Sequence, residues 1–154
     1  MSRPGPSVLA PPPFIFLGAL AVGLVLQALR PLPPFPHSLV ARLAGWCLVI
    51  AGLALSTAVV IHFRRAETPV TPLRETRQLV RSGPYRFSRN PDYLGQTLVT
   101  AGLGLVVASG WVLAALLPAL LLVRYGVIAR EERYLEETFG GEYREFMNRV
   151  PRWL

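Results

Sequence analysis

The stretch at residues 94–123 reads LGQTLVTAGLGLVVASGWVLAALLPALLLV and contains no charged residue. Because a helix rises about 1.5 Å per residue, this stretch is longer than one crossing of a hydrocarbon layer about 30 Å thick requires. Ser109 and Gly110 lie near its middle, and such a pair is typical of a turn. We therefore expect a helical hairpin, with helices at about 93–108 and 111–129, rather than one long tilted helix.

The remainder of the chain has the composition of a membrane protein. Hydrophobic residues make up 52% of its 154 residues, and the mean hydropathy is +0.41, which is high for a soluble domain. Two more apolar runs, at about 14–29 and 43–62, precede the hairpin. One Cys and two His residues are too few for a zinc site of the usual kind, so no metal is expected. We predict an all-α integral membrane protein with about four transmembrane helices in a single domain, residues 1–154.

The distribution of basic residues predicts the topology. The chain has 16 Lys and Arg residues against 9 acidic ones, a net charge of +7. Most of the basic residues lie in the loop at 63–92 and in the last part of the chain, after the hairpin. We expect both segments on the cytoplasmic side, because basic segments are retained there, and both termini with them. This topology explains the charge without a nucleic acid partner.

The loop at 63–92 carries unusual chemistry in its last part, which continues into the hairpin as GPYRFSRNPDYLG, Gly83 to Gly95. Pro84 and Pro91 prevent one continuous helix there, since proline lacks an amide donor and restricts the residue before it. Two phenols and two guanidinium groups within so short a span favour a polar ligand over packing. An ordinary basic loop beside the membrane is the alternative, because it needs only the arginines.

The C-terminal helices expected at 130–154 contain a second unusual feature. On a helix, Ile128 and Phe139 share one face, and Glu131 and Glu132 follow Ile128 on that face by three and four residues. Two carboxylates are thus carried inward beside apolar residues, although solvated surface charges are the simpler interpretation. Because the hairpin returns the chain to the same side, the loop and these glutamates should meet. Such a pocket suits a zwitterionic ligand beside a lipophilic one.

These two motifs resemble those of a known family. GPYRFSRNPDYLG, followed by a hairpin and then by REERYLEETFGGEYREFMNRVPRW, is similar to the isoprenylcysteine carboxyl methyltransferase family of integral membrane methyltransferases, which is related to the phospholipid methyltransferases. The resemblance extends over residues 63–153, and TPVTP upstream of the loop fits bacterial members. Two motifs in this order around a hairpin are more specific than either motif alone.

The resemblance implies S-adenosylmethionine-dependent methyl transfer to a lipophilic acceptor that arrives from the bilayer, at the cytoplasmic face of a bacterial inner membrane. The acceptor headgroup would be a carboxylate, a thiol or an amine. Arg89 and Tyr93 are the implied catalytic residues, and Arg89 would orient an anionic headgroup. A carboxylate such as Glu132 would hold the donor's ammonium, an arginine would hold its carboxylate, and tyrosine rings would pack against adenine or the sulfonium. The implied donor-binding residues are Tyr85, Asn90, Pro91, Tyr93, Leu94, Glu131 and Glu132.

At one position the chain departs from the family pattern. Eukaryotic members have His where this chain has Asn90, and Asn is a variant associated with bacterial relatives. An amide can form a hydrogen bond, but it cannot take up a proton near pH 7. We therefore expect no base at this position, and prenylcysteine is not assigned as the acceptor.

Two other functions stay open at this point. A membrane sterol-type reductase that uses NADPH has a related loop, but Gln96 and the absence of His from the loop disfavour it. A non-catalytic scaffold that binds anionic lipid through the loop needs no donor site. The sequence leaves the acceptor and the oligomeric state open, because apolar helix walls select for little besides lipophilicity.

Overall fold

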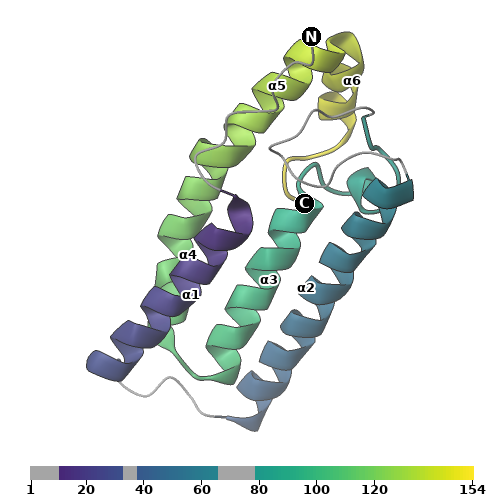
Figure 1. Cartoon of the computed structure of the whole chain (residues 1–154). Coiled ribbons are helices and arrows are strands. Elements are labelled where there is room, and N and C mark those ends of the chain that lie inside the picture. Colours follow the sequence, from purple (N-terminus) through teal and green to yellow (C-terminus); the bar gives the residue numbers. More distant parts are fainter. Residues whose placement is uncertain (1–10, 33–37, 66–78) are drawn as a thin grey trace.

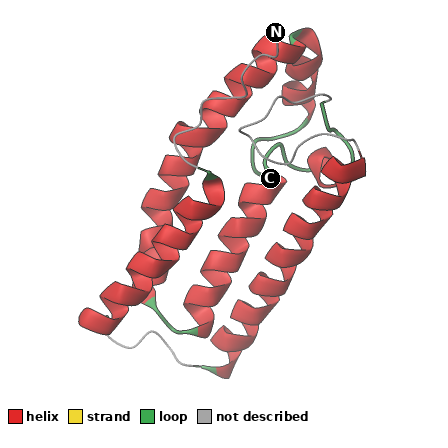
Figure 2. Cartoon of the chain, viewed as in Figure 1, coloured by secondary structure: helices red, strands yellow, loops and turns green. Residues whose placement is uncertain are grey.

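The computed structural model describes residues 11–32, 38–65 and 79–154 (Figure 1). Within these ranges all regular structure is helical, which confirms the predicted class (Figure 2). The first ten residues, the proline-rich connection at 33–37 and residues 66–78 of the expected cytoplasmic loop lie outside the described ranges. In chain order the elements are α1 (Pro12–Leu29), α2 (Leu39–Arg65), the 3-10 turn η1 (Gly83–Arg86), α3 (Pro91–Val106), α4 (Gly110–Leu122), the π-helical segment η2 (Val123–Ile128), α5 (Ala129–Phe139) and α6 (Gly141–Arg149).

Three helical units are long and apolar enough to cross a membrane. They are Pro12–Leu29, Leu39–Arg65 and Gly110–Phe139, with mean hydropathies of 2.0, 2.2 and 2.2. α3 has 16 residues, or about 24 Å of helix, and it runs beside α2 and α4 in the same bundle (Figure 1). The three spans confirm an integral membrane protein, and a fourth crossing by α3 stays a prediction.

The two longest units extend beyond their expected bounds. α2 covers Leu39–Arg65 rather than 43–62, and its last turn is basic, which the helix dipole favours. The unit that begins at Gly110 does not end near residue 129 but continues through η2 into α5. A π-helical segment bonds residues five apart and is frequent at functional sites. It therefore lets one continuous helix carry both the membrane span and the acidic residues of α5.

The hairpin turn between α3 and α4 lies where the Ser-Gly pair predicted it. The buried Ser109 caps α4 by accepting a hydrogen bond from Val112 N at 3.3 Å. Its hydroxyl also donates to Gln27 Oε1 of α1 at 3.3 Å, and Trp111 Nε1 donates to the carbonyl of Arg30 at 2.7 Å. These bonds tie the hairpin tip to the C-terminal end of α1, at the end of the molecule opposite α6 (Figure 1).

α2 and α3 approach closely through glycines spaced seven residues apart on each helix. A Cβ atom at Gly102 would lie 2.5 Å from the carbonyl oxygen of Gly45, and one at Gly52 would lie 2.5 Å from that of Gly95. Any side chain at these positions would force the two backbones apart, so the glycines fix the spacing and the antiparallel register. The start of α3 is thereby held against the C-terminal half of α2.

The buried core lies where α1, α3, α4 and η2 meet. Tyr93 in the first turn of α3 belongs to this cluster and is 7% exposed, whereas the valines of η2 are fully buried. Packing thus joins the start of α3 to the segment that leads directly into α5. The cluster consists of Phe16, Tyr93, Leu116, Val123, Val127 and Ile128.

Candidate functional site

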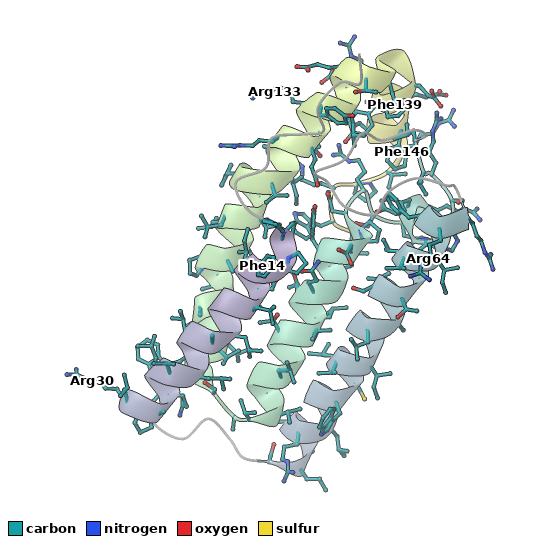
Figure 3. All side chains as sticks on the ribbon, viewed as in Figure 1. Phe14, Arg30, Arg64, Arg133, Phe139 and Phe146 are labelled. Carbon is teal, nitrogen blue, oxygen red and sulfur yellow. The ribbon has the colours of Figure 1, made fainter. Side chains whose placement is uncertain are left out.

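Three segments that are distant in sequence converge where α3 begins. They are the η1 region with the residues that follow it, the helix α5, and the last residues of the chain, 150–154, which we call the C-terminal segment (Figure 1). α5 and α6 form the same end of the molecule, with Phe139 and Phe146 lying together there and Arg30 at the opposite end (Figure 3). The chain reverses between these helices at Gly140, whose φ of 55° suits glycine.

The C-terminal end of α2 packs against the η1 turn. Gly83 has a φ of 59°, and a Cβ there would collide with the ring of His62. That ring is held by its Nδ1–H, which donates to the carbonyl of Ala58 at 2.7 Å. Phe63 meets Tyr85 edge to face, with ring centroids 5.6 Å apart. His62 and Phe63 therefore pack against the turn that carries Tyr85 and hold it in position. The sequence did not indicate this role.

Tyr93 joins the start of α3 to α5. Its hydroxyl donates to Glu131 Oε1 at 2.7 Å. Tyr85 is partly buried, and the pKa of its phenol is raised by desolvation and by the carboxylates of Asp92 and Glu131. The amide of Gln96 donates to Asp92 Oδ2 at 2.7 Å, which orients that carboxylate. Two tyrosines and two carboxylates thus form one side of the site.

Glu132 forms the other side together with two arginines. Arg152 binds it through two parallel bonds, from Nε to Oε1 at 3.0 Å and from Nη2 to Oε2 at 2.6 Å. Arg89 Nη1 lies 2.9 Å from Glu132 Oε1, and the side chains of Arg89 and Glu132 are 12% and 14% exposed. Bidentate pairs of this kind are geometrically specific as well as strong. Glu132 is therefore already engaged by positive charge in this structure.

Arg89 retains hydrogen-bonding capacity. Its Nη1 is close to Glu132 but outside hydrogen-bond geometry, so Nη1 and the buried Nε have no acceptor among the described residues. The guanidinium also hydrogen-bonds the phenol of Tyr143. Burial and the charge of Glu132 raise the pKa of this phenol to about 12, and Arg89 opposes that shift. A buried donor without an acceptor costs about 1–3 kcal/mol, so an acceptor that reached these atoms would be stabilised.

The C-terminal segment is hydrogen-bonded to the loop. Arg89 N donates to the carbonyl of Pro151 at 2.9 Å, and Asn90 Nδ2 donates to the carbonyl of Arg152 at 2.9 Å. Ser88 Oγ also donates to the carbonyl of Arg152, at 3.3 Å, and accepts a hydrogen bond from the backbone N–H of Asn90 at 3.1 Å. Trp153 packs against the core cluster. The side-chain amide of Asn90 therefore anchors the segment that carries Arg152.

Six of the residues expected from the sequence come together here. The other two belong to the first turn of α3, where Pro91 starts the helix and has no amide donor to lose. Leu94 N donates to the carbonyl of Asn90 at 3.1 Å, so this residue closes that turn. The catalytic and donor-binding roles of all eight residues stay predictions. The six residues are Tyr85, Arg89, Asn90, Tyr93, Glu131 and Glu132.

Sequence reasoning missed several polar residues of the site. Arg152 lay inside the quoted C-terminal motif, but nothing local marks it as the partner of a glutamate twenty residues earlier. Tyr143 carries no local signal for the site in the sequence, whereas its phenol interacts with Arg89. Asp92 followed Pro91 directly and shared the spacing of an i, i+4 pair with Gln96, a signal that was available and unused.

The fold and this cluster define an integral membrane protein with charged and aromatic side chains gathered at one end of a helical bundle. The chain belongs to the phospholipid methyltransferase family, whose model matches residues 40–142. This finding confirms the resemblance drawn from the two motifs. No solved structure matches the chain.

Three known proteins are similar to parts of the chain. Protein-S-isoprenylcysteine O-methyltransferase B of Arabidopsis thaliana is 30% identical over 111 residues, which cover 70% of this chain and 55% of the relative. The cobalt-zinc-cadmium resistance protein CzcN of Cupriavidus metallidurans is 38% identical over 81 residues, covering 53% of this chain and 37% of that protein. An uncharacterized protein of Haemophilus influenzae is 51% identical over 35 residues, which are 23% of this chain and 56% of that protein. The chain thus spans about half the length, or less, of these relatives.

Proposed function

We propose that this protein is a membrane methyltransferase that transfers a methyl group from S-adenosylmethionine to a lipophilic acceptor at the cytoplasmic face of a bacterial inner membrane. Family membership supports methyl transfer, and the similar Arabidopsis protein is named as an O-methyltransferase. The observation that carries the donor assignment is the convergence of Tyr93–Glu131 with Arg89–Glu132–Arg152 beside the membrane spans. S-adenosylmethionine combines a sulfonium, an ammonium and a carboxylate, so its site needs charges of both signs.

The residues present fit such a donor by their chemistry. Arg89 offers unpartnered buried donors for a carboxylate. Glu131 offers a carboxylate whose Oε1 is held by the hydroxyl of Tyr93. The rings of Tyr85 and Tyr93 flank the acidic side, and aromatic faces attract cations by about 0.5–2 kcal/mol.

When bound, S-adenosylmethionine supplies an electrophilic methyl group. The protein's contribution is mainly to hold donor and acceptor in line, because well-oriented reactants gain about 7–11 kcal/mol. General base catalysis would add about 10²- to 10⁴-fold, and Asn90 cannot supply it, since its amide is bonded to the Arg152 carbonyl and has no basic nitrogen. Arg89 offers its free N–H groups to an anionic group of the donor or of the acceptor, and Tyr93 holds Glu131 in place.

The acceptor reaches the site from the bilayer in this proposal. The helices around the site expose large hydrophobic side chains over much of their length, including Leu17, Ile50 and Leu121. A lipophilic molecule partitioned among them would present its polar end at the level where α3 begins. Carboxylates, thiols and amines remain the acceptor classes, and incubation of membranes with a labelled donor followed by identification of the labelled lipid distinguishes them.

Isothermal titration calorimetry of the purified protein in detergent tests the proposal. We expect saturable binding of S-adenosylmethionine by the wild type, a large loss in Glu131→Gln, and no change in the matched control Glu145→Gln, whose carboxylate pairs with Arg149 on the surface. Absence of saturable binding by folded wild-type protein would refute the proposal. Binding of NADPH in its place would support a reductase, and binding of neither would leave the lipid-binding scaffold.

A further inference from the structure

The two neighbouring glutamates of α5 have opposite electrostatic surroundings. Glu132 contacts the guanidinium groups of Arg89 and Arg152. Glu131 accepts a hydrogen bond from Tyr93, and the charged groups that act on it are the carboxylates of Asp92 and Glu132. Adjacent residues on a helix point about 100° apart, so the two side chains face two distinct but neighbouring places. The site is therefore polarised.

The side around Glu132 has an excess of positive charge. Two guanidinium groups face one carboxylate, so one positive charge is left over. Glu132 has both oxygens occupied, since Arg152 binds Oε1 and Oε2 and Arg89 approaches Oε1. Arg89 still has N–H groups without an acceptor within the described part of the chain. Both the net charge and the free donors suit a carboxylate and repel an ammonium.

The side around Glu131 has an excess of negative charge. Asp92 is oriented by Gln96 and directly precedes Tyr93, whose hydroxyl donates to Glu131. Its carboxylate also raises the pKa of Tyr85. Two carboxylates with two phenol rings make a surface that suits a cation through charge and through the ring faces. A sulfonium cannot donate a hydrogen bond, so charge and aromatic contact are the means by which a protein can recognise it.

We propose that the donor binds with its carboxylate at Arg89 and Arg152 and with its ammonium and sulfonium at Glu131 and Asp92. Glu132 is then a positioning residue that holds the two arginines together, rather than the ligand of the ammonium that the sequence suggested. Asn90 contributes indirectly, because its side chain holds the carbonyl of Arg152. This assignment rests on the proposed function and specifies the polarity of the same site.

The affinities of the wild-type protein for three nucleosides test the two charged sides separately. The compounds are S-adenosylmethionine, decarboxylated S-adenosylmethionine and S-adenosylhomocysteine. Decarboxylated S-adenosylmethionine keeps the sulfonium and the amine but lacks the carboxylate, whereas S-adenosylhomocysteine keeps the amino acid but lacks the sulfonium charge. Wild-type protein should bind the decarboxylated compound about 10- to 100-fold more weakly than S-adenosylmethionine, the loss that corresponds to charge-assisted hydrogen bonds. Equal affinity for the two compounds would overturn the assignment of the arginines.

The affinities of variant proteins for the same compounds test which residues form each charged side. Arg152→Gln should weaken S-adenosylmethionine binding by about tenfold and leave binding of the decarboxylated compound within about twofold. Arg152→Lys should recover part of the loss, since it keeps the charge but not the paired bonds. The matched control is Arg149→Gln, three residues earlier, which removes an exposed pair with Glu145 and should change neither affinity.

Glu131→Gln completes the design. It should weaken both sulfonium compounds and reduce the preference for S-adenosylmethionine over S-adenosylhomocysteine, because the carboxylate no longer attracts the sulfonium. If Arg152→Gln instead tightened S-adenosylmethionine binding, Glu132 would be an ammonium ligand that the arginine blocks, and the polarity would be reversed. If folded wild-type protein bound none of the three compounds, the proposed function itself would fail. Equal affinities for S-adenosylmethionine and its decarboxylated form, or tighter binding by Arg152→Gln, would instead contradict only the polarity of the site.

Discussion

The hydrogen bond between Tyr93 and Glu131 connects the start of α3 to α5. The substitution Tyr93→Phe removes this bond and keeps the aromatic ring. The hydroxyl donates to a carboxylate oxygen at 2.7 Å, and the tyrosine is 7% exposed. Water has little access to replace the lost donor there. A bond to a charged acceptor contributes about 1.5–3 kcal/mol, so we expect the free energy of unfolding to fall by that amount. Binding of S-adenosylmethionine should weaken as well, because Glu131 loses the group that orients it.

A double-mutant cycle separates this bond from other effects of the substitution. Unfolding is followed by titration with sodium dodecyl sulfate in mixed micelles for the wild type, Tyr93→Phe, Glu131→Ala and the double variant, because a glutamine would still accept the hydrogen bond. The coupling energy should be about 1 kcal/mol or more, as for residues in direct contact. Tyr125→Phe is the matched control, since that phenol is 64% exposed and its ring contact with Arg124 survives. A coupling energy near zero, with Tyr93→Phe as stable as the wild type, would refute the reasoning.

Three further predictions concern packing, the C-terminal segment and pH. Gly102→Ala should lower the thermal midpoint in detergent, because its Cβ would lie 2.5 Å from a carbonyl of α2, whereas Gly18→Ala, which meets nothing within 4 Å, should not. Asn90→Leu should free the C-terminal segment, seen as faster cleavage by carboxypeptidase, and equal rates would contradict the anchoring role. The pKa of Tyr143 is raised from 10.0 to about 12 on folding, so its contribution to stability is full below pH 10 and is lost as the pH rises to about 12. Tyr143→Phe should flatten the unfolding free energy between these pH values, and an unchanged slope would count against the shift.

Patterns of apolar residues predicted the helical architecture well, because membrane spans need length and apolar composition above all. The hairpin turn followed from Ser109 and Gly110, and the structure adds a cap and cross-helix bonds at that point. The continuity of α4 with α5 through η2 was not predicted. Val123 and Val127 of this π-helical segment are fully buried, and π-helical turns are rare in proteins.

The pairing between the loop and α5 was predictable from topology, whereas the individual contacts were not. The hairpin requires residues near Tyr93 and residues near Glu131 to return to one side, and their hydrogen bond confirms that they meet. Which glutamate faces which charge depends on the rotation of α5 and on the path of the C-terminal segment. Both depend on long-range contacts, such as the packing of Trp153 against the core cluster, that local propensity does not encode.

Asn90 illustrates how an amide can replace a ring at a position near a reacting centre. Its Nδ2 donates to the carbonyl of Arg152, and its backbone N–H is bonded to Ser88 Oγ, so both of its donors serve the shape of the site. A carbonyl acceptor needs only an N–H partner, which a neutral imidazole also offers. A residue that holds the C-terminal segment in this way positions Arg152 against Glu132. Under the proposed function, the requirement at this position is for a hydrogen-bond donor rather than for a base, which a side chain that cannot exchange protons satisfies.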